Sequence, residues 1–305
     1  MTIQCFGPGI DPGLMDRAGF LFDHHLVDHP ALSLESLAGV IPRLSPRQVF
    51  HSSGRLSNTD NFDRAHLEHR PAAGLETALE NLRTTDGYIM VRRPETDPAF
   101  KPLFDALRSE VGQLVAAAGI PRAINDAMLY LFIASPNSVT PFHIDRYSTF
   151  LMQCRGSKVV TVYSPWDARV VDDEDTEHFF ANTGRRPVWR PETEILGQQF
   201  DFRPGQALHI PFVAGHHVRN GSEDVSISLS IIFKTARTRQ LVRAMLFNHY
   251  SRASMARLGM RPRRVALDHP GIASKAAAWR AFTGPFTTSR SIIERAGGKL
   301  SAMMR

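Results

Sequence analysis

Between residues 128 and 235, apolar side chains come in short runs, some alternating with polar ones, that are separated by turn residues. The runs are MLYLFIA, STFLMQC, KVVTVYS, QALHIPF and VSISLSIIF. Their length and their content of Val, Ile, Phe and Tyr are typical of β-strands. The segments CRGSK (154–158) and RPGQA (203–207) provide Gly or Pro where the chain must reverse. The pattern predicts an antiparallel β core, closed as a barrel or stacked as a sandwich.

Helical spacing dominates the sequence before this core. Leu, Ala, Val and Phe recur at three- and four-residue intervals in SLESLAGVI, GLETALENLRTTDG and AFKPLFDALRSEVGQLVAAAG, all within 30–120. Such spacing predicts helices. The run YIMVRR at 88–93 is instead rich in β-forming residues. We expect a strand there that extends the sheet formed later in the chain.

Two further regions differ from the core. Residues 164–199 show little periodicity, and we expect an insertion or lid-like loop, since long irregular segments in compact domains are often functional. Helical spacing returns after 235, with further helices expected near 272–282 and 289–304. This last region opens with an apolar stripe formed by Leu241, Ala244, Met245 and Leu246.

These patterns divide the chain into three expected parts: an N-terminal helical region with one strand (1–125), a β barrel (126–235) and a C-terminal helical region (236–305). The last part is basic, with 14 Lys or Arg against two acids, whereas residues 1–235 carry 22 against 28. We expect the basic tail to dock on the acidic body or on a second copy. Nucleic acid is the less favoured partner because no helix-turn-helix pattern is present. The apolar stripe also makes a homodimer through the C-terminal helices an expectation.

Composition excludes several classes of protein. With 43% hydrophobic and 22% charged residues the chain is an ordinary globular protein. Its two cysteines, Cys5 and Cys154, form no C-x-x-C pair, which argues against a disulfide framework or a thiolate zinc site. No run of 18 apolar residues and no basic-then-apolar leader occurs. We therefore expect a cytoplasmic protein without a membrane span.

The candidate chemistry lies in TPFHIDRYSTFLMQCRGSK (140–158). His143 and Asp145 are two residues apart and would project from the same side of an extended strand, a spacing that suits two ligands of one metal. His216 or His217, just before another strand pattern, offers a third ligand. Two imidazoles and one carboxylate form the facial triad of non-haem iron oxygenases. An H-x-D pair alone also occurs on surface strands without function, so the order and β context of all three residues matter.

Two ordered motifs carry a family resemblance that covers roughly residues 128–233. The first consists of Thr140, His143, Asp145 and Lys158. The second consists of Pro204, Gly205, Gln206, Leu208, Ile210, Pro211, His216 and Val218. Together they resemble the cupin-like JmjC oxygenases, in particular the group of the asparaginyl hydroxylase called factor inhibiting hypoxia-inducible factor. This chain departs from that pattern at Gln206, where the family has Asp, and near Ile231 or Ile232, where the asparaginyl hydroxylase has Asn.

The resemblance implies a fold, a function and a set of roles. The fold would be a double-stranded β-helix of the cupin, jelly-roll and JmjC-like kind, a mainly β core flanked by N-terminal and C-terminal helices. The function would be that of an Fe(II)- and 2-oxoglutarate-dependent dioxygenase, a hydroxylase that couples substrate oxidation with O2 to decarboxylation of 2-oxoglutarate to succinate. The alignment implies that His143, Asp145 and His216 are the catalytic metal ligands. Lys158 would bind the distal carboxylate of 2-oxoglutarate.

Some of these roles also follow from the chemistry of the residues. A lysine such as Lys158 in a strand beside a metal offers a fixed positive charge for a dicarboxylate, although an ordinary solvated lysine is the alternative. The hydroxyl groups of Thr140 and Thr149 are candidate donors to the same carboxylate. Polar strand positions that would face the cavity and orient a ligand are Gln153, Ser228 and Ser230.

The sequence leaves the substrate open. By analogy we expect a protein or peptide side chain, with an amino-acid-like small molecule nearly as plausible. Two other readings compete: a metal-dependent cupin enzyme that does not use 2-oxoglutarate, in which Lys158 has no assigned task, and a ligand-sensing cupin-like regulator whose basic tail contacts nucleic acid.

Overall fold

The computed structural model describes residues 3–71, 74–121 and 124–284. The chain divides into two compact units. Unit 1 consists of Met1–Val170 with Val188–Ala236, and unit 2 of Val171–Pro187 with Arg237–Arg305. The expected division into an N-terminal helical region, a barrel and a C-terminal helical region, with boundaries at 125 and 235, stays a prediction. Among the described helices, none has both the length and the apolar character needed to span a bilayer.

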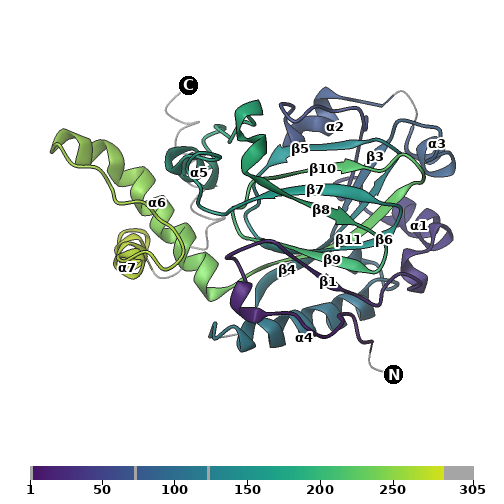
Figure 1. Cartoon of the computed structure of the whole chain (residues 1–305), viewed down its shortest axis with the longest axis horizontal. Coiled ribbons are helices and arrows are strands. Elements are labelled where there is room, and N and C mark those ends of the chain that lie inside the picture. The colour runs from purple at the N-terminus through teal and green to yellow at the C-terminus, as the bar shows by residue number, and fades with distance from the viewer. Residues whose placement is uncertain (1–2, 72–73, 122–123, 285–305) are drawn as a thin grey trace. The chain divides into compact units, whose positions relative to one another are not determined.

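Unit 1 contains two antiparallel sheets (Figure 1). The seven-stranded sheet has the order β1-β9-β6-β11-β4-β3-β2, and the four-stranded sheet has the order β5-β10-β7-β8. The strands are β1 Phe20–Asp23, β2 Val49–Ser52, β3 Tyr88–Arg92, β4 Asn125–Ala134, β5 Val139–His143, β6 Ser148–Arg155, β7 Lys158–Tyr163, β8 Gly197–Phe202, β9 Gln206–Ile210, β10 His216–Asn220 and β11 Ser226–Lys234. The antiparallel β core predicted from the sequence is confirmed, including the strand at 88–93, which pairs with β4.

Alternation along β11 separates the two faces of the large sheet. The main apolar core includes Ile227, Leu229, Ile231 and Phe233. The alternate positions carry the buried serines Ser226, Ser228 and Ser230. Successive side chains of a strand point to opposite faces, so the serines face the interior between the sheets. A second apolar cluster lines that interior with residues of both sheets, among them Leu151, Leu208, Val160 and Val218.

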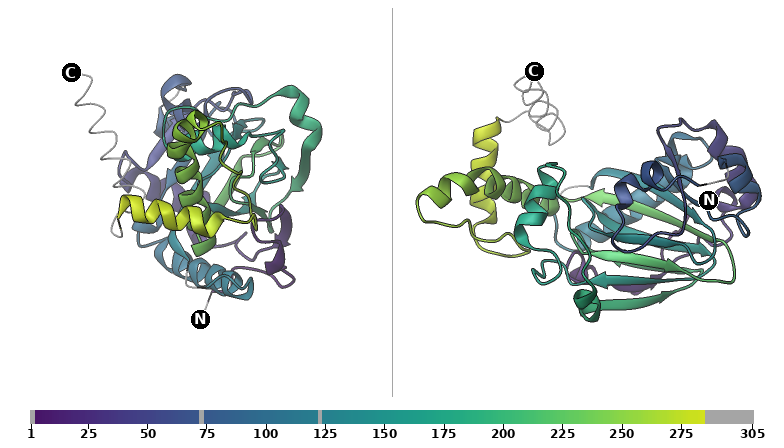
Figure 2. Two further views of the ribbon diagram at one scale, coloured as in Figure 1. Left: turned by 90° about the vertical axis from the view of Figure 1, so that its left-hand side faces the viewer. Right: turned by 90° about the horizontal axis from the view of Figure 1, so that it is seen from above.

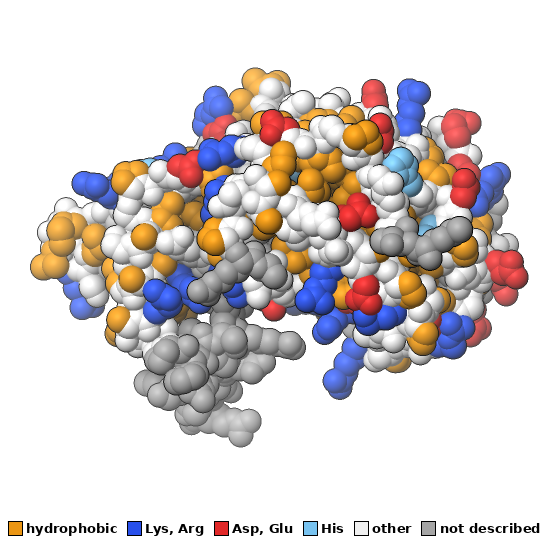
Figure 3. All heavy atoms as spheres, turned by 90° about the horizontal axis from the view of Figure 1, so that it is seen from below, with side chains coloured by type: hydrophobic (Ala, Val, Ile, Leu, Met, Phe, Trp, Pro, Cys, Tyr) orange, Lys and Arg blue, Asp and Glu red, His pale blue; other side chains and the backbone are white. Residues whose placement is uncertain are grey.

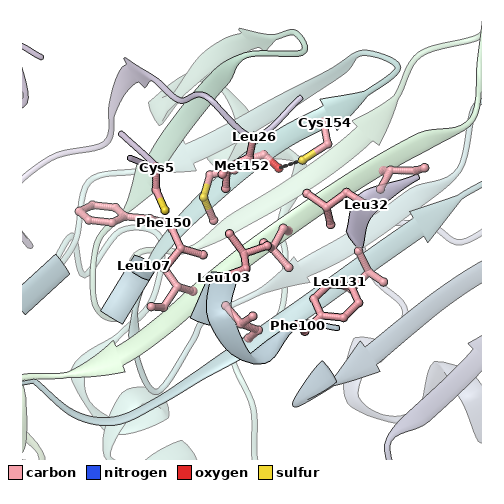
Figure 4. Packing of buried hydrophobic residues seen from close by; sticks show 14 of the residues in the cluster. Cys5, Leu26, Leu32, Phe100, Leu103, Leu107, Leu131, Phe150, Met152 and Cys154 are labelled. Carbon is pink, nitrogen blue, oxygen red and sulfur yellow. Dashed lines mark hydrogen bonds between the residues drawn. The ribbon is translucent and has the colours of Figure 1, made fainter. Parts of the chain in front are cut away.

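Helix α4 (Lys101–Ala117) covers the outer face of the large sheet (Figures 1 and 2). Leu103, Leu107, Val111 and Val115 are all buried. A spacing of four residues places them on one side of the helix. Figure 4 shows Leu103 and Leu107 in the same cluster as Phe150 and Met152 of β6.

The remaining α-helices are α1 Leu34–Val40, α2 Ala65–Glu68, α3 Leu75–Glu80, α5 Asp173–Phe180, α6 Ala236–Arg257 and α7 Ile272–Thr283. The 3-10 helices are η1 Pro12–Leu14, η2 Pro30–Leu32, η3 Ile41–Arg43, η4 Phe62–Arg64, η5 Pro94–Thr96 and η6 Pro191–Leu196. Helices expected in SLESLAGVI, after residue 100, after 235 and at 272–282 are therefore confirmed, while the helix expected at 289–304 lies outside the described residues.

Two expectations need correction. The segment 164–199 is not a continuous loop, because it contains α5 and η6. Asp172 caps α5 by accepting a hydrogen bond from the backbone N–H of Asp175, and acidic residues occupy the first turn, where they stabilise the helix dipole. The mainly helical reading of 30–120 is also incomplete, because β2 lies there and pairs with β3.

Unit 2 is held together by a buried ion pair. Glu177 of α5 is 2% exposed, and its Oε2 lies 2.6 Å from Nη2 of Arg252 in α6. Asn248 Nδ2 donates to Glu177 Oε1 at 2.9 Å. Helices α6 and α7 meet through Tyr250 and Trp279, whose rings stack with centroids 5.2 Å apart, and Figure 2 shows the two helices crossing.

Candidate functional site

Three candidate metal ligands come together at one end of the small sheet. His143 is the last residue of β5 and His216 the first of β10, and the two residues pair across the strands. With Asp145 they offer ligand atoms that all lie within 4.8 Å of one another. Asp145 Oδ1 lies 3.9 Å from His143 Nε2, and Oδ2 lies 3.7 Å from His216 Nε2. Two separate segments of sequence thus place two imidazoles and a carboxylate around one point.

The position of Asp145 differs from the sequence expectation. We expected it on the same strand face as His143, but β5 ends at His143 and Asp145 lies in the turn before β6. The turn, and not the strand itself, carries the carboxylate to the two imidazoles.

Backbone carbonyl groups orient both imidazoles. His143 Nδ1 lies 2.8 Å from the Pro141 carbonyl oxygen, and His216 Nδ1 lies 3.0 Å from that of Ala214. Because a carbonyl oxygen only accepts, each Nδ1 must donate, which leaves the lone pair of Nε2 directed at the cluster. Burial, reinforced by the neighbouring His143, lowers the pKa of His216 to about 4. His216 is therefore neutral at physiological pH, the form that binds metal.

His217, the alternative third ligand, faces the other side of β10. Its Nε2 lies 3.2 Å from Glu194 Oε2 and 3.4 Å from the Tyr163 hydroxyl. Adjacent strand residues point to opposite faces, so His216 and His217 cannot both reach the cluster. Of the two, the structure places His216 beside His143 and Asp145.

An irregularity in the pairing of β5 with β10 turns Thr140 toward the interior. His143 pairs with His216 and Thr140 with Val218, so three steps along β5 match two along β10. Without this β-bulge, residues three apart would face opposite sides. Thr140 Oγ1 lies 3.1 Å from the hydroxyl of Tyr88 on β3, to which it donates. Burial raises the pKa of Tyr88 well above its ordinary value, so this hydroxyl stays protonated.

Lys158 opens β7 and is buried between the sheets with 7% exposure. Its Nζ donates to Ser228 Oγ at 2.6 Å, and Ser228 Oγ donates to Gln153 Oε1, also at 2.6 Å. In the described parts of the chain, no ion pair includes Lys158. Burial lowers the pKa of Lys158 to about 7. The interior therefore holds a buried amine whose hydrogen-bond partner is neutral and whose protonated form has no counter-charge in the described residues.

Thr149 and Ser230, the other predicted contacts, are also buried. Ser230 is the next residue after Ser228 on the inward face of β11. Thr149 lies four residues from Gln153 on β6, about 13 Å along a strand. The structure thus joins Lys158 to Ser228 and Gln153, and it separates Thr149 from that group.

Two residues of the site were missed at the sequence level. Tyr88 stands at the start of a correctly predicted strand, and an aromatic hydroxyl there was the available signal. Phe62 of η4 packs on His143, with ring centroids 4.6 Å apart, and nothing in its local sequence indicates this contact. The departure at Gln206 proves structural, since its Oε1 accepts a hydrogen bond from the Arg203 N–H within the turn before β9.

Comparison with known proteins supports this architecture. No family model matches the sequence. Among solved structures, YcfD of Escherichia coli superposes with a TM-score of 0.51 and 16% identity, over 95% of this chain and 71% of YcfD. YcfD, described as a ribosomal oxygenase, has also been solved with cobalt and 2-oxoglutarate; that structure gives a TM-score of 0.46 and 16% identity over 88% of this chain and 64% of that one.

This similarity establishes the fold, a double-stranded β-helix of the jelly-roll or cupin kind with added helices. The closer likeness to the asparaginyl hydroxylase group stays a prediction.

Proposed function

We propose that this chain is an Fe(II)- and 2-oxoglutarate-dependent oxygenase whose iron is held by His143, Asp145 and His216. The observation that carries the proposal is the convergence of these ligand atoms within 4.8 Å. The donor set fits the metal, because two neutral imidazoles and one carboxylate are the ligands of non-haem iron sites that keep positions open. Bound iron would supply the activation of dioxygen that couples oxidation of a substrate to decarboxylation of 2-oxoglutarate.

The rest of the site suits the cosubstrate. Lys158 is a buried amine whose hydrogen-bond partner, Ser228, is neutral, and an anionic carboxylate would stabilise its protonated form. Thr140 and Tyr88 present two further hydroxyl groups toward the interior. We assign the distal carboxylate of 2-oxoglutarate to Lys158, Thr140 and Tyr88. Ser228 and Gln153 act as positioning residues that hold the lysine.

The chain's own residues also prepare the reaction. The carbonyls of Pro141 and Ala214 fix the tautomers of the two imidazoles. The apolar side chains between the sheets, including Leu151 and Val160, limit water around the reacting groups, which strengthens the charge interaction at Lys158. Phe62 packs against the imidazole of His143 and restricts its rotation.

For the substrate we propose a protein or peptide side chain, with hydroxylation as the reaction. YcfD, which shares the fold, is described as a ribosomal oxygenase, so ribosomal proteins are the first candidates to test. Free amino acids and short peptides form the comparison set, because a small-molecule oxygenase would turn those over instead.

Succinate formation from 2-oxoglutarate, measured in air with added iron(II) and without substrate, tests the proposal. The wild type is expected to show slow turnover that disappears in His143→Ala and requires much more 2-oxoglutarate in Lys158→Ala. Calorimetry under nitrogen would measure 2-oxoglutarate binding to the metal-loaded protein directly. Absence of both turnover and binding would favour a cupin that does not use 2-oxoglutarate.

A homodimer through the C-terminal helices stays a prediction. The apolar stripe that motivates it is already buried within one chain: Leu241 is 1% exposed, Ala244 0%, Met245 1% and Leu246 4%. A second copy is therefore not needed to cover these residues. The molar mass in solution, measured for the full chain and for a chain ending at residue 235, decides whether the helices join two copies.

A further inference from the structure

The helical unit carries an excess of positive charge that its own acids do not balance. Residues 237–284 contain ten Lys or Arg and a single acid, Asp268. Unit 2 also includes residues 171–187, with two more Arg and five acids, so its described part has twelve cations against six acids. Four of those acids are used in ion pairs: Arg252 pairs with Glu174 and Glu177, Arg264 with Asp173, and Arg185 with Asp175. The surplus of cations has to be accommodated by solvent or by an anionic partner.

The surplus is concentrated in two places. The connection from α6 to α7, RLGMRPRR (257–264), has four arginines in eight residues, all of them exposed. Its backbone is held in place, because the Arg263 carbonyl accepts hydrogen bonds from Asn248 Nδ2 at 2.9 Å and from Lys275 Nζ. An ordered loop can present several guanidinium groups at fixed positions, which a flexible tail cannot do.

The second place is on the helices themselves. Arg239 and Arg243 are one turn apart on α6, and α7 brings Arg280 close to them. After burial, the charges of Arg280 and Arg239 are the causes that lower the pKa of Arg243. Like charges brought together in this way destabilise the unit, and a bound anion removes that cost.

Aromatic and apolar side chains lie on the same unit. Tyr250 is 49% exposed, and its ring stacks on Trp279. Phe282, one turn further along α7, is 85% exposed, and Leu258 in the arginine-rich connection is 71% exposed. Figure 3 shows basic side chains among apolar ones on the part of the surface formed by α6 and α7.

We propose that unit 2 is a binding surface for single-stranded RNA, in which the arginines contact phosphates and Tyr250 and Phe282 stack on unpaired bases. Arginine-rich surfaces with exposed aromatic rings are typical of proteins that bind single strands. RNA is favoured as the ligand because its loops and ends display the unstacked bases that such rings bind. The proposal is independent of the chemistry assigned to the barrel.

Two other occupants fit the observations less well. An anionic membrane attracts Lys as well as Arg, yet nine of the ten cations in 237–284 are Arg, which favours bidentate phosphate contacts and stacking. A second copy meeting this surface about a two-fold axis would place the same patch against itself. Like charges would then oppose each other across the interface.

Fluorescence anisotropy with a labelled single-stranded RNA of about 16 nucleotides tests the proposal. The full chain is used without metal or 2-oxoglutarate, over a series of salt concentrations. The test variant is Arg257→Gln/Arg261→Gln/Arg263→Gln. The matched control, Arg47→Gln/Arg70→Gln/Arg108→Gln, removes equal charge from exposed positions of unit 1. Thermal unfolding verifies that both variants are folded.

The wild type is expected to bind with a dissociation constant on the order of 10 μM at physiological salt. The test variant should bind at least about tenfold more weakly, and its slope of log affinity against log salt should fall by about 2, since each lost single-strand phosphate contact contributes about 0.7. Phe282→Ala should weaken binding about tenfold while the slope stays unchanged, because stacking releases no counterions.

Four results would overturn the proposal. They are no RNA binding by the wild type at about 50 mM salt, equal losses in the test and control variants, tighter binding to vesicles containing phosphatidylserine than to RNA, and equal affinity for double-stranded DNA. The last result would show that unpaired bases are not recognised.

Discussion

Two buried charges, one in each unit, have different partners. Glu177 in unit 2 is 2% exposed and meets the guanidinium of Arg252 at 2.6 Å, with Asn248 as a further donor. Lys158 in unit 1 is 7% exposed, and within the described residues its amino group hydrogen-bonds only to the neutral hydroxyl of Ser228. Burial disfavours the charged form of both, raising the pKa of Glu177 and lowering that of Lys158. A buried charge with a counter-charge belongs to the fold, whereas one without it suits a ligand of opposite charge.

The largest expected effect tests whether the barrel interior is built for a metal and its cosubstrate. His143→Ala removes one of three ligands, and bound iron and succinate formation should both fall by at least about 100-fold, because even outer-shell partners of ligands contribute 10- to 100-fold. Metal analysis and the succinate assay measure this. His217→Ala is the matched control, since His217 faces Glu194 instead of the cluster. Loss of iron in the control and its retention in His143→Ala would show that the ligands are assigned wrongly.

The next effect concerns the pH dependence of folding. Burial lowers the pKa of Lys158 to about 7 in the folded chain, from an ordinary value of 10.5 that applies to an exposed lysine. Between these values the unfolded chain binds a proton that the folded chain has released, so stability rises with pH from about 7 to about 10.5, by up to about 5 kcal/mol. In Lys158→Met the increase of stability with pH that comes from this lysine should be absent. Urea denaturation at several pH values measures it.

A lysine on the surface provides the control for that experiment. Lys101→Met changes an exposed side chain of α4 and should leave the rise with pH intact. The rise should also shrink when 2-oxoglutarate is bound to the wild type, because its carboxylate stabilises the protonated lysine. A rise of equal size in Lys158→Met and wild type would mean that folding does not lower the pKa of Lys158.

The buried ion pair in unit 2 should stabilise the fold, so removing one partner should lower the free energy of unfolding. Arg252→Met leaves Glu177 buried without its counter-charge, and the free energy of unfolding should fall by about 3–5 kcal/mol. Adding Glu177→Gln to this variant should restore much of the loss, since the uncompensated charge is then gone. Denaturant unfolding of the two variants measures the difference. If the double variant is no more stable than Arg252→Met, packing and not charge explains the effect.

The comparison also shows which parts of the site could be predicted from the sequence. Alternating strand patterns placed Ser228 and Lys158 in the β core, because period-two alternation depends on local sequence alone. The inward turn of Thr140 depends on a bulge against β10, which no local pattern reveals. Phe62 reaches His143 from a short 3-10 helix whose position is set by tertiary packing.

Helix α5 was missed for a different reason. The segment from Asp172 is short and strongly polar, so hydrophobic periodicity gave little signal there. The signal that was available was the capping pattern, an Asp before an acidic first turn. The buried pair of Glu177 with Arg252 joins residues 75 positions apart, a separation at which sequence pattern alone gives no pairing.

The smallest effect distinguishes two serines that the sequence treated alike. Ser228 accepts the hydrogen bond from Lys158, whereas Ser230 lies one inward position further along β11. Loss of one neutral hydroxyl partner costs about 1 kcal/mol, so Ser228→Ala should raise the KM for 2-oxoglutarate about fivefold and leave kcat nearly unchanged. Ser228→Thr should recover most of the affinity, and Ser230→Ala should raise KM less than Ser228→Ala. Equal increases in both alanine variants would mean that the polarity of the interior, and not the orientation of Lys158, governs cosubstrate binding.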